Sequence, residues 1–197
     1  MPYKVLVAAG FLAMAAFVVV MIAGVLSDRT VSAQSDAETY CRSAGGAVVE
    51  RTPVLNAASA HPMLLDGAIR FCEFTGGAGA EPADSRIAIG LETLAAVGPT
   101  RAALAYLARA PLPEALPPSS PGLANPASVY CASLGGAEGD WIAESLRGPE
   151  RVVTMCVFPD RSLIDSWGLA YHAMGAIRGA DLTPLLRYRT GAATPES

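Results

Sequence analysis

The feature that most constrains this chain is a short pattern that occurs twice, ninety residues apart. Residues 36–50 read DAETYCRSAGGAVVE, and residues 124–140 read ANPASVYCASLGGAEGD. Seven of eleven aligned positions are identical, which is more than an Ala- and Gly-rich composition explains. The identical pairs are Ala37 and Ala127, Tyr40 and Tyr130, Cys41 and Cys131, Ser43 and Ser133, Gly45 and Gly135, Gly46 and Gly136, and Ala47 and Ala137. We therefore interpret the chain as two copies of one small structural unit.

Both copies of the pattern are typical of a short helix that a glycine ends. In the second copy Asn125 is a favourable N-cap, Pro126 suits the first helical position, and the Gly-Gly pair supplies a left-handed stop. In the first copy Ser35 and Glu38 have the spacing of a capping box. The sequence therefore predicts a helix at the start of each unit.

A strand and a second helix are expected downstream in each copy. Residues 68–74 (AIRFCEF) and 151–158 (RVVTMCVF) are rich in the β-branched and aromatic residues that strands favour, and each has a cysteine two residues before a phenylalanine. Apolar residues then recur at helical spacing. They are Ile87, Leu91 and Leu94 in the first copy, and Leu163, Trp167 and Ala170 in the second.

We predict an α+β fold in which an N-terminal single transmembrane helix precedes two small related helix-strand-strand-helix units, each held by its own disulfide. Five prolines in fifteen residues favour an extended linker between the units. The predicted divisions are a membrane anchor or signal segment (1–33), a first unit (34–109), a linker (110–124), a second unit (125–180) and a fraying tail (181–197).

An uncharged apolar run extends from Val5 to Leu26. As a helix these 22 residues would extend about 33 Å, enough to cross a hydrocarbon core of about 30 Å. Cleavage after Ala33 is the alternative, because small residues there suit a leader peptidase, although the run is longer than a usual signal segment. Lys4 places the N-terminus in the cytoplasm and the bulk of the chain in the periplasm. The predicted location is the bacterial inner membrane, or the periplasm after cleavage.

The four cysteines lie one early and one late in each unit. Four cysteines allow three pairings, and sequence alone does not choose among them. If each unit once folded alone, its disulfide lies within the unit, which favours Cys41 with Cys72 and Cys131 with Cys156. Disulfides persist outside the cytoplasm, whereas a metal or redox site would need closely spaced ligands such as C-x-x-C, which the sequence lacks. We predict no metal and no cofactor.

The second unit resembles a family of small exported bacterial domains of unknown function that often carry a hemolysin label. The resemblance rests on NPASVYCASLGG (125–136) and CVFPDRSLIDSW (156–167), and it covers roughly residues 125–175. The chain departs from the family pattern at Arg161, where the family has glycine, and at Ile164, where it has a further cysteine. The resemblance implies a fold, and its label implies lysis, but a lytic role lacks a second apolar span with which to breach a bilayer.

Few residues are candidates for acid–base chemistry. We interpret both histidines, His61 in a loop-like insertion and His172 off the apolar stripe of a helix, as solvated or locally bonded. Asp160 and Asp165 flank a predicted helix start, where capping already explains acidic residues. We therefore name no catalytic residue. A pocket that gathers Asp160, Asp165 and His172 would favour an enzyme instead.

The function that the sequence favours is a membrane-tethered periplasmic binding or accessory module. The alternatives are an envelope hydrolase that uses acidic residues of the second unit and, with less support, a lytic protein. The net charge of −4 argues against binding to nucleic acid, since a basic patch is needed there. A strip of small residues in the apolar run suits packing against a larger membrane complex, although an Ala-rich run has alanines on any face. The strip is Ala9, Ala13, Ala16 and Ala23.

Overall fold

The computed structural model describes residues 34–76, 85–113, 125–146 and 148–188. No helix among these residues is long and apolar enough to cross a membrane, so the predicted transmembrane helix is not an element of the described fold. The run from Val5 to Leu26 and its alanine strip lie outside the described residues, as do residues 114–124 of the predicted linker.

Residues 34–43 form the first described helix and lead into the first strand. The strands that follow are β1 (Ala47–Leu55), β2 (Met63–Leu64), β3 (Ile69–Thr75), β4 (Arg86–Gly90), β5 (Ala137–Ile142), β6 (Val152–Val157) and β7 (Leu163–Asp165). The helices are α2 (Leu91–Ala95), α3 (Arg101–Ala108), α4 (Pro126–Ser133) and α5 (Ser166–Ala173), with a 3-10 turn, η1, at Gly148–Arg151.

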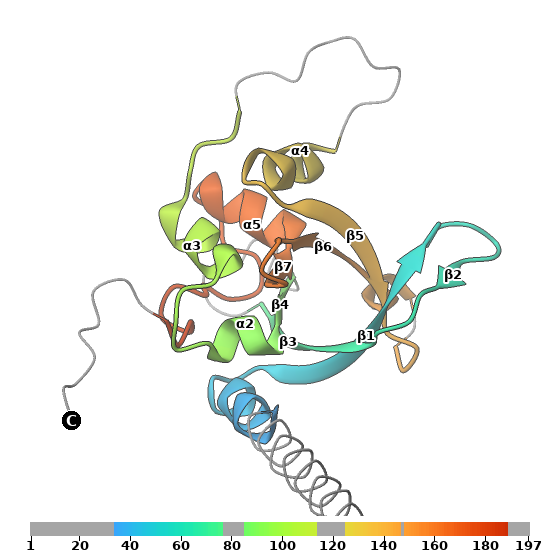
Figure 1. Ribbon diagram of the computed structural model, residues 1–197, viewed down its shortest axis with the longest axis horizontal. Coiled ribbons are helices and arrows are strands. Elements are labelled where there is room, and N and C mark those ends of the chain that lie inside the picture. Colours follow the sequence, from blue (N-terminus) through green and yellow to red (C-terminus); the bar gives the residue numbers. More distant parts are fainter. Residues whose placement is uncertain (1–33, 77–84, 114–124, 147, 189–197) are drawn as a thin grey trace, which may run out of the picture. The chain divides into compact units, whose positions relative to one another are not determined.

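Six of these strands form one closed antiparallel sheet, the barrel (Figure 1). The strand order is β1-β3-β4-β7-β6-β5, and β5 pairs back onto β1. The first half of the described chain (residues 34–113) supplies β1, β3 and β4, and the second half (residues 125–188) supplies β5, β6 and β7. The halves join where β4 meets β7, through Ile89 and Ile164, and where β1 meets β5. The short β2 adds to the far end of β1 as a projecting hairpin.

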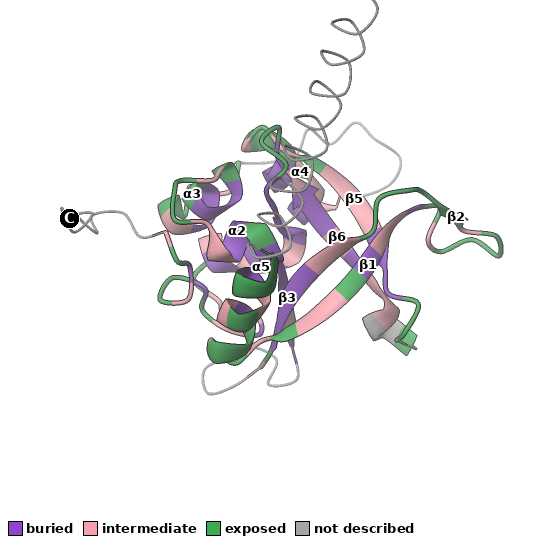
Figure 2. Cartoon of the chain, turned by 60° about the horizontal axis from the view of Figure 1, so that its bottom comes forward, coloured by how far each residue is buried: buried purple, intermediate pink, exposed green. Residues whose placement is uncertain are grey.

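The barrel has an apolar core on each side of its wall. Inside it, Phe71 and Trp141, one from each half, meet edge to face with their ring centroids 5.4 Å apart. A buried ion pair, Arg51 with Glu73, lies on the same face of β1 and β3 as Phe71, with 2.5 Å between nitrogen and oxygen. Outside the wall the helices cover the larger core, which Figure 2 shows in purple along the strands and the facing helix sides.

The two disulfides join Cys41 to Cys72 and Cys131 to Cys156, which confirms the pairing within each unit. Each links the helix that opens a half to the middle strand of that half. The repeated glycines follow from this arrangement, because a Cβ at Gly46 would overlap Cys72 and one at Gly136 would overlap Cys156.

The prediction of two helix-strand-strand-helix units was wrong. Each half contributes three strands to the barrel, and neither half closes a sheet by itself, because closure needs the β4–β7 and β1–β5 pairings. The described residues from Ala37 onward form one compact unit. The missed strands are β4 and β7. Each runs straight into a helix with no turn between them, so the helical spacing from Ile87 to Leu91, and from Leu163 to Trp167, crosses a strand–helix boundary.

The tail does not fray as predicted up to residue 188. Leu182 and Leu186 are fully buried against the helices, and the amide of Arg187 donates to the carbonyl of Leu94. Tyr40 also donates its hydroxyl proton to the carbonyl of Leu185. The segment after α5 therefore closes the outer core over the first half.

Candidate ligand-binding site

The site begins at the tight turn between β6 and β7. The amide of Phe158 donates to the carbonyl of Ser162 at 2.9 Å, and the amide of Arg161 donates to the carbonyl of Phe158 at 2.8 Å. This leaves a three-residue loop with Pro159 at its start. Its last residue, Arg161, has φ 66°, the left-handed position that glycine usually fills in such loops.

Asp160 binds the N-terminus of α3, which belongs to the other half. One carboxylate oxygen accepts from the amide of Arg101 at 2.7 Å, and the other accepts from the hydroxyl of Ser162 at 2.6 Å. Ser162 in turn accepts from the amide of Ala102. Burial alone would raise the pKa of Asp160, but these hydrogen bonds outweigh it and hold the pKa below its ordinary value. Both oxygens of the Asp160 carboxylate are therefore occupied by hydrogen bonds, one of which caps α3.

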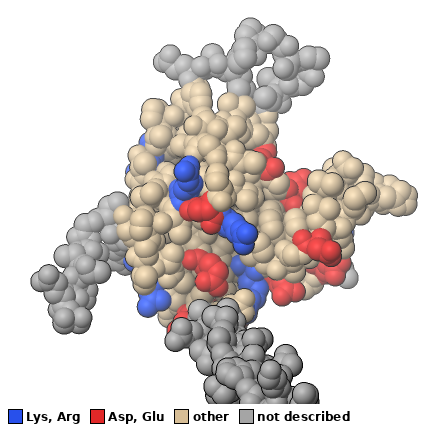
Figure 3. Space-filling view, viewed as in Figure 1, with Lys and Arg blue, Asp and Glu red and all other residues tan. Residues whose placement is uncertain are grey.

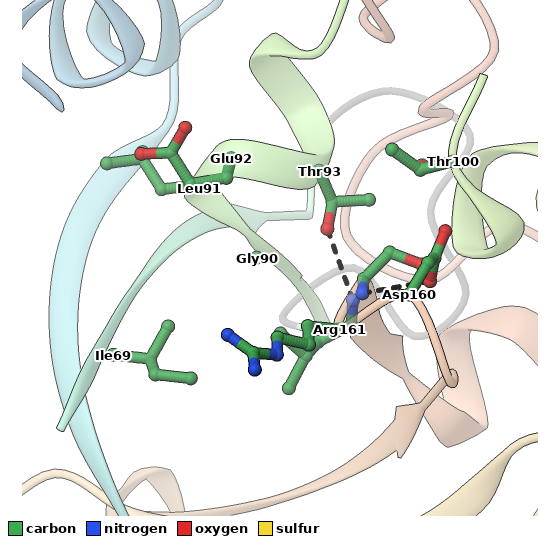
Figure 4. A pocket seen from close by; sticks show the side chains of 10 residues that line it. Ile69, Gly90, Leu91, Glu92, Thr93, Thr100, Asp160 and Arg161 are labelled. Carbon is green, nitrogen blue, oxygen red and sulfur yellow. Dashed lines mark hydrogen bonds between the residues drawn. The ribbon is translucent and has the colours of Figure 1, made fainter. Parts of the chain in front are cut away.

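A pocket of about 340 Å³ opens beside this turn, at one end of the barrel (Figure 4). Its floor includes Ile69 and Leu163, which also pack in or against the inner core. The turn and α2 form its walls, and Glu92 and Arg161 are both exposed. The lining residues are Ile69, Gly90, Leu91, Glu92, Thr93, Thr100, Asp160, Arg161, Ser162 and Leu163.

Thr93 fixes the two walls of this pocket to each other. Its buried hydroxyl oxygen accepts from the amide of Leu163 at 3.1 Å, a contact between α2 and the start of β7. Figure 4 shows this bond spanning the pocket's edge. Together with the contacts of Asp160, it holds the turn against the first half.

Asp165 lies away from the pocket and caps its own helix. It is buried, and its carboxylate accepts from the amide of Gly168 at 2.7 Å at the start of α5. Burial raises the pKa of Asp165 to about 6, although the hydrogen bond from Gly168 and the charge of Arg178 oppose the rise. The interpretation of Asp165 as a capping residue is confirmed, since it is the N-cap of α5, which begins at Ser166.

His172 was wrongly interpreted as solvated or locally bonded. Its side chain is buried, stacks on Tyr106 with ring centroids 3.8 Å apart, and neither ring nitrogen has a hydrogen-bond partner among the described residues. Burial, and then the charge of Arg109, lower the pKa of His172 and so favour the neutral ring. His61 is exposed in the loop that follows β1, as expected.

The three groups that an enzyme would need do not share a pocket. Asp160 lines the pocket, whereas neither Asp165 nor His172 does. The described residues also contain no cluster of three or more side chains suited to a metal ion. The geometry therefore provides a cavity with fixed walls, but it does not bring the candidate acid–base groups together.

A family model described as a domain of unknown function (DUF333) matches residues 122–172. No curated protein and no solved structure matches the chain. The match supports the resemblance to a small domain of unknown function, and it extends over α4, β5, β6, β7 and most of α5. Half of the barrel thus corresponds to the family domain.

The motif residues in this half serve the fold. The side chain of Asn125 accepts from the amide of Ala127 at 3.0 Å and so caps α4, and Tyr130 donates to the carbonyl of Ala110 at 2.7 Å. The pocket residues of the first half, such as Gly90 and Thr93, carried no signal that sequence reasoning recognised. Arg161 stood out only as a departure from glycine.

Proposed function

We propose that this chain is an exported binding module whose ligand site is the pocket between α2 and the β6–β7 turn. The observation that carries the proposal is the pocket itself. Its volume of about 340 Å³ lies within the range of small-molecule sites, and its apolar floor has a few polar groups around it.

The hydrogen bonds that join the pocket walls also support binding. The turn is tied to α3 through Asp160 and Ser162, and to α2 through Thr93. A preformed site costs less to order when a ligand enters, which favours affinity. Export is supported by the two disulfides, since such bonds persist in oxidising compartments.

A thermal-shift screen of small apolar compounds with the full chain tests this proposal. Compounds that bind the native state raise Tm. Ile69→Trp fills the floor of the pocket, and Leu104→Trp places the same side chain on the exposed face of α3 as a control. We expect hits with wild type and Leu104→Trp, and their loss with Ile69→Trp. Hits that persist in Ile69→Trp would place the site elsewhere, and an absence of hits would argue against a small-molecule site.

The other functions named from the sequence, including the envelope hydrolase, remain predictions. The accessory role in a larger membrane complex rests on residues outside the described part, and co-migration of the chain with such a complex in native separation would support it. The lytic role that the family label implies is tested by dye release from liposomes. Neither role draws on the pocket.

We also infer that the two halves arose by duplication. The supporting observations are the shared order of an opening helix, three barrel strands and a helix that follows the last of them, and the disulfide at the same place in each half. The repeated tyrosines, Tyr40 and Tyr130, both donate to a backbone carbonyl. A hybrid chain tests this inference. In it a second copy of residues 137–165 replaces residues 47–90, and the original residues 137–165 stay in place. Closure with both disulfides formed would support it, and a chain that forms neither would contradict it.

A further inference from the structure

The pocket contains one positively charged side chain, Arg161, which no described residue neutralises. Within the described part of the chain, the ion pairs involve other arginines: Arg42, Arg51 and Arg70. The neighbouring Asp160 already accepts hydrogen bonds on both oxygens, and Figure 4 shows the Arg161 side chain extending away from it toward Ile69. The guanidinium group is therefore available to a ligand.

The backbone of Arg161 adds a second observation. A side chain at φ 66° is strained relative to glycine, which would complete this turn at no steric cost. Strain of this kind clusters at ligand-binding and active sites, and the inference runs from the outlier to the function. Here the strained residue delivers a cation to the wall of an apolar pocket.

The rest of the pocket suits the apolar part of a ligand. Ile69, Leu91 and Leu163 offer aliphatic surface within the lining of the pocket. Since a water molecule occupies about 30 Å³, the pocket volume corresponds to roughly ten non-hydrogen atoms. A medium-chain aliphatic molecule therefore fits the space.

We propose, building on the function above, that the pocket binds an apolar molecule that carries one carboxylate, with the carboxylate on Arg161 and the chain between Ile69 and Leu163. Arginine recognises carboxylates through paired hydrogen bonds from its planar group. Transfer of the aliphatic chain from water supplies the remaining affinity.

Glu92 sets the direction in which the ligand lies. It comes from α2, across the pocket from Arg161, and it makes no ion pair with a described residue. Its negative charge repels a carboxylate and attracts an amine. Replacing Glu92 and replacing Arg161 should therefore change the affinity for an anion in opposite directions.

A charge series of equal chain length tests the proposal. Octanoate, 1-octanol and octylamine are titrated calorimetrically into the full chain with both disulfides formed, free of detergent or in lipid nanodiscs with empty discs as the blank. The variants are Arg161→Gln, Arg161→Gly and Glu92→Gln. We expect wild type to bind octanoate most tightly, then octanol, then octylamine.

Arg161→Gln should weaken octanoate binding about fivefold, as expected for one charged contact at an exposed site, and should leave octanol binding unchanged. Glu92→Gln should strengthen octanoate binding and weaken octylamine binding. Arg161→Gly should remove the preference for octanoate while raising Tm, because it relieves the left-handed strain. If Arg161 only shaped the turn, Arg161→Gly would leave that preference unchanged.

Equal binding of the three compounds, or tighter binding of octylamine, would overturn the assignment of a carboxylate and leave the proposed binding function in place. Binding of none of them, together with an empty thermal-shift screen, would overturn both. Loss of octanol binding in Arg161→Gln would indicate damage to the pocket, and Arg161→Gly would then decide whether the charge matters.

Discussion

A strand runs straight into a helix at two places, β4 into α2 and β7 into α5. The two junctions have the same strand pairing but different residues at the helix N-cap. Ile89 and Ile164 pair with each other across the join between the halves, and each also pairs with the disulfide cysteine of its own half. The next residue is Gly90 in one half and Asp165 in the other. Their backbone dihedral angles are nearly equal, with φ −53° and ψ 134° for Gly90, and φ −52° and ψ 121° for Asp165.

The difference lies in the side chain. Asp165 caps α5 and is buried, whereas Gly90 offers α2 no side-chain cap and lines the pocket. Three residues later, Thr93 reaches across to the amide of Leu163, while Gly168 makes room for Ile87. The halves thus share the scaffold of strands and disulfides, and the site arises where their sequences differ.

The largest expected effect tests whether the scaffolds are equivalent. The two disulfides close segments of similar length, with sequence separations of 31 and 25, so removing either one by paired Cys→Ser changes should cost about 3 to 4 kcal/mol. Urea unfolding of the two double variants measures this. A disulfide whose removal costs nothing would break the equivalence of the halves.

Asp165 should make stability depend on pH, an effect that its counterpart Gly90 does not contribute. Its pKa is raised from 3.8 to about 6, so its contribution is complete below pH 3.8 and is lost as pH rises through about 6. Asp165→Asn keeps a capping oxygen and carries no charge. The free energy of unfolding of wild type should therefore fall by about 3 kcal/mol relative to that of Asp165→Asn between pH 3.8 and pH 7.

Urea unfolding at several pH values checks this expectation, with Asp165→Ser as a second uncharged cap. His172 changes stability in the opposite direction, because its lowered pKa favours the folded state as pH rises. Its contribution is common to all three proteins and cancels in the difference. Parallel profiles for wild type and Asp165→Asn would show that Asp165 is not ionised differently on folding.

Thr93→Val should lower the free energy of unfolding by about 1 to 2 kcal/mol. Valine has nearly the same shape as threonine, but it leaves the buried amide of Leu163 without its acceptor. Thr93→Ser keeps the hydroxyl and serves as the control. The urea midpoint of each variant gives the comparison. A Thr93→Val protein as stable as Thr93→Ser would mean that this hydrogen bond does not hold the halves together.

The smallest effect on stability is expected from Gly90→Ala. A Cβ there would lie 3.0 Å from the Thr93 hydroxyl and 3.3 Å from Leu163 Cδ1, and this crowding offsets the gain of about 0.4 to 1 kcal/mol from a stiffer unfolded chain. Octanoate binding should nevertheless weaken, because the pocket becomes smaller. Unchanged calorimetric affinity would show that the missing side chain at Gly90 is not what opens the site.

The features that the sequence predicted correctly are local. Asn125 before Pro126, and a glycine pair after each early cysteine, carry their meaning within a few residues. The pairing of Cys41 with Cys72 followed from comparing the two copies. Such signals need no knowledge of which distant strands meet.

The closed sheet and the pocket were not predictable in this way. Pairing of β4 with β7 joins Ile89 to Ile164, and a strand of three residues such as β7 has too short an alternation to distinguish it from a helix start. Arg161 could be recognised as unusual for its turn. Its place in a pocket depends on α2, which reaches the turn only after the two halves have joined.

Closure of the sheet also determines when the chain is protected from aggregation with other chains. A chain that is made or exported from its N-terminus presents β1, β3 and β4 first, with the outer edges of β1 and β4 open. Open strand edges recruit other chains. The edge of β1 closes when β5 has emerged, and the edge of β4 closes only when the strand that ends at Asp165 has emerged. Holding the nascent first half apart from other chains during that interval is therefore a requirement that this architecture places on the cell.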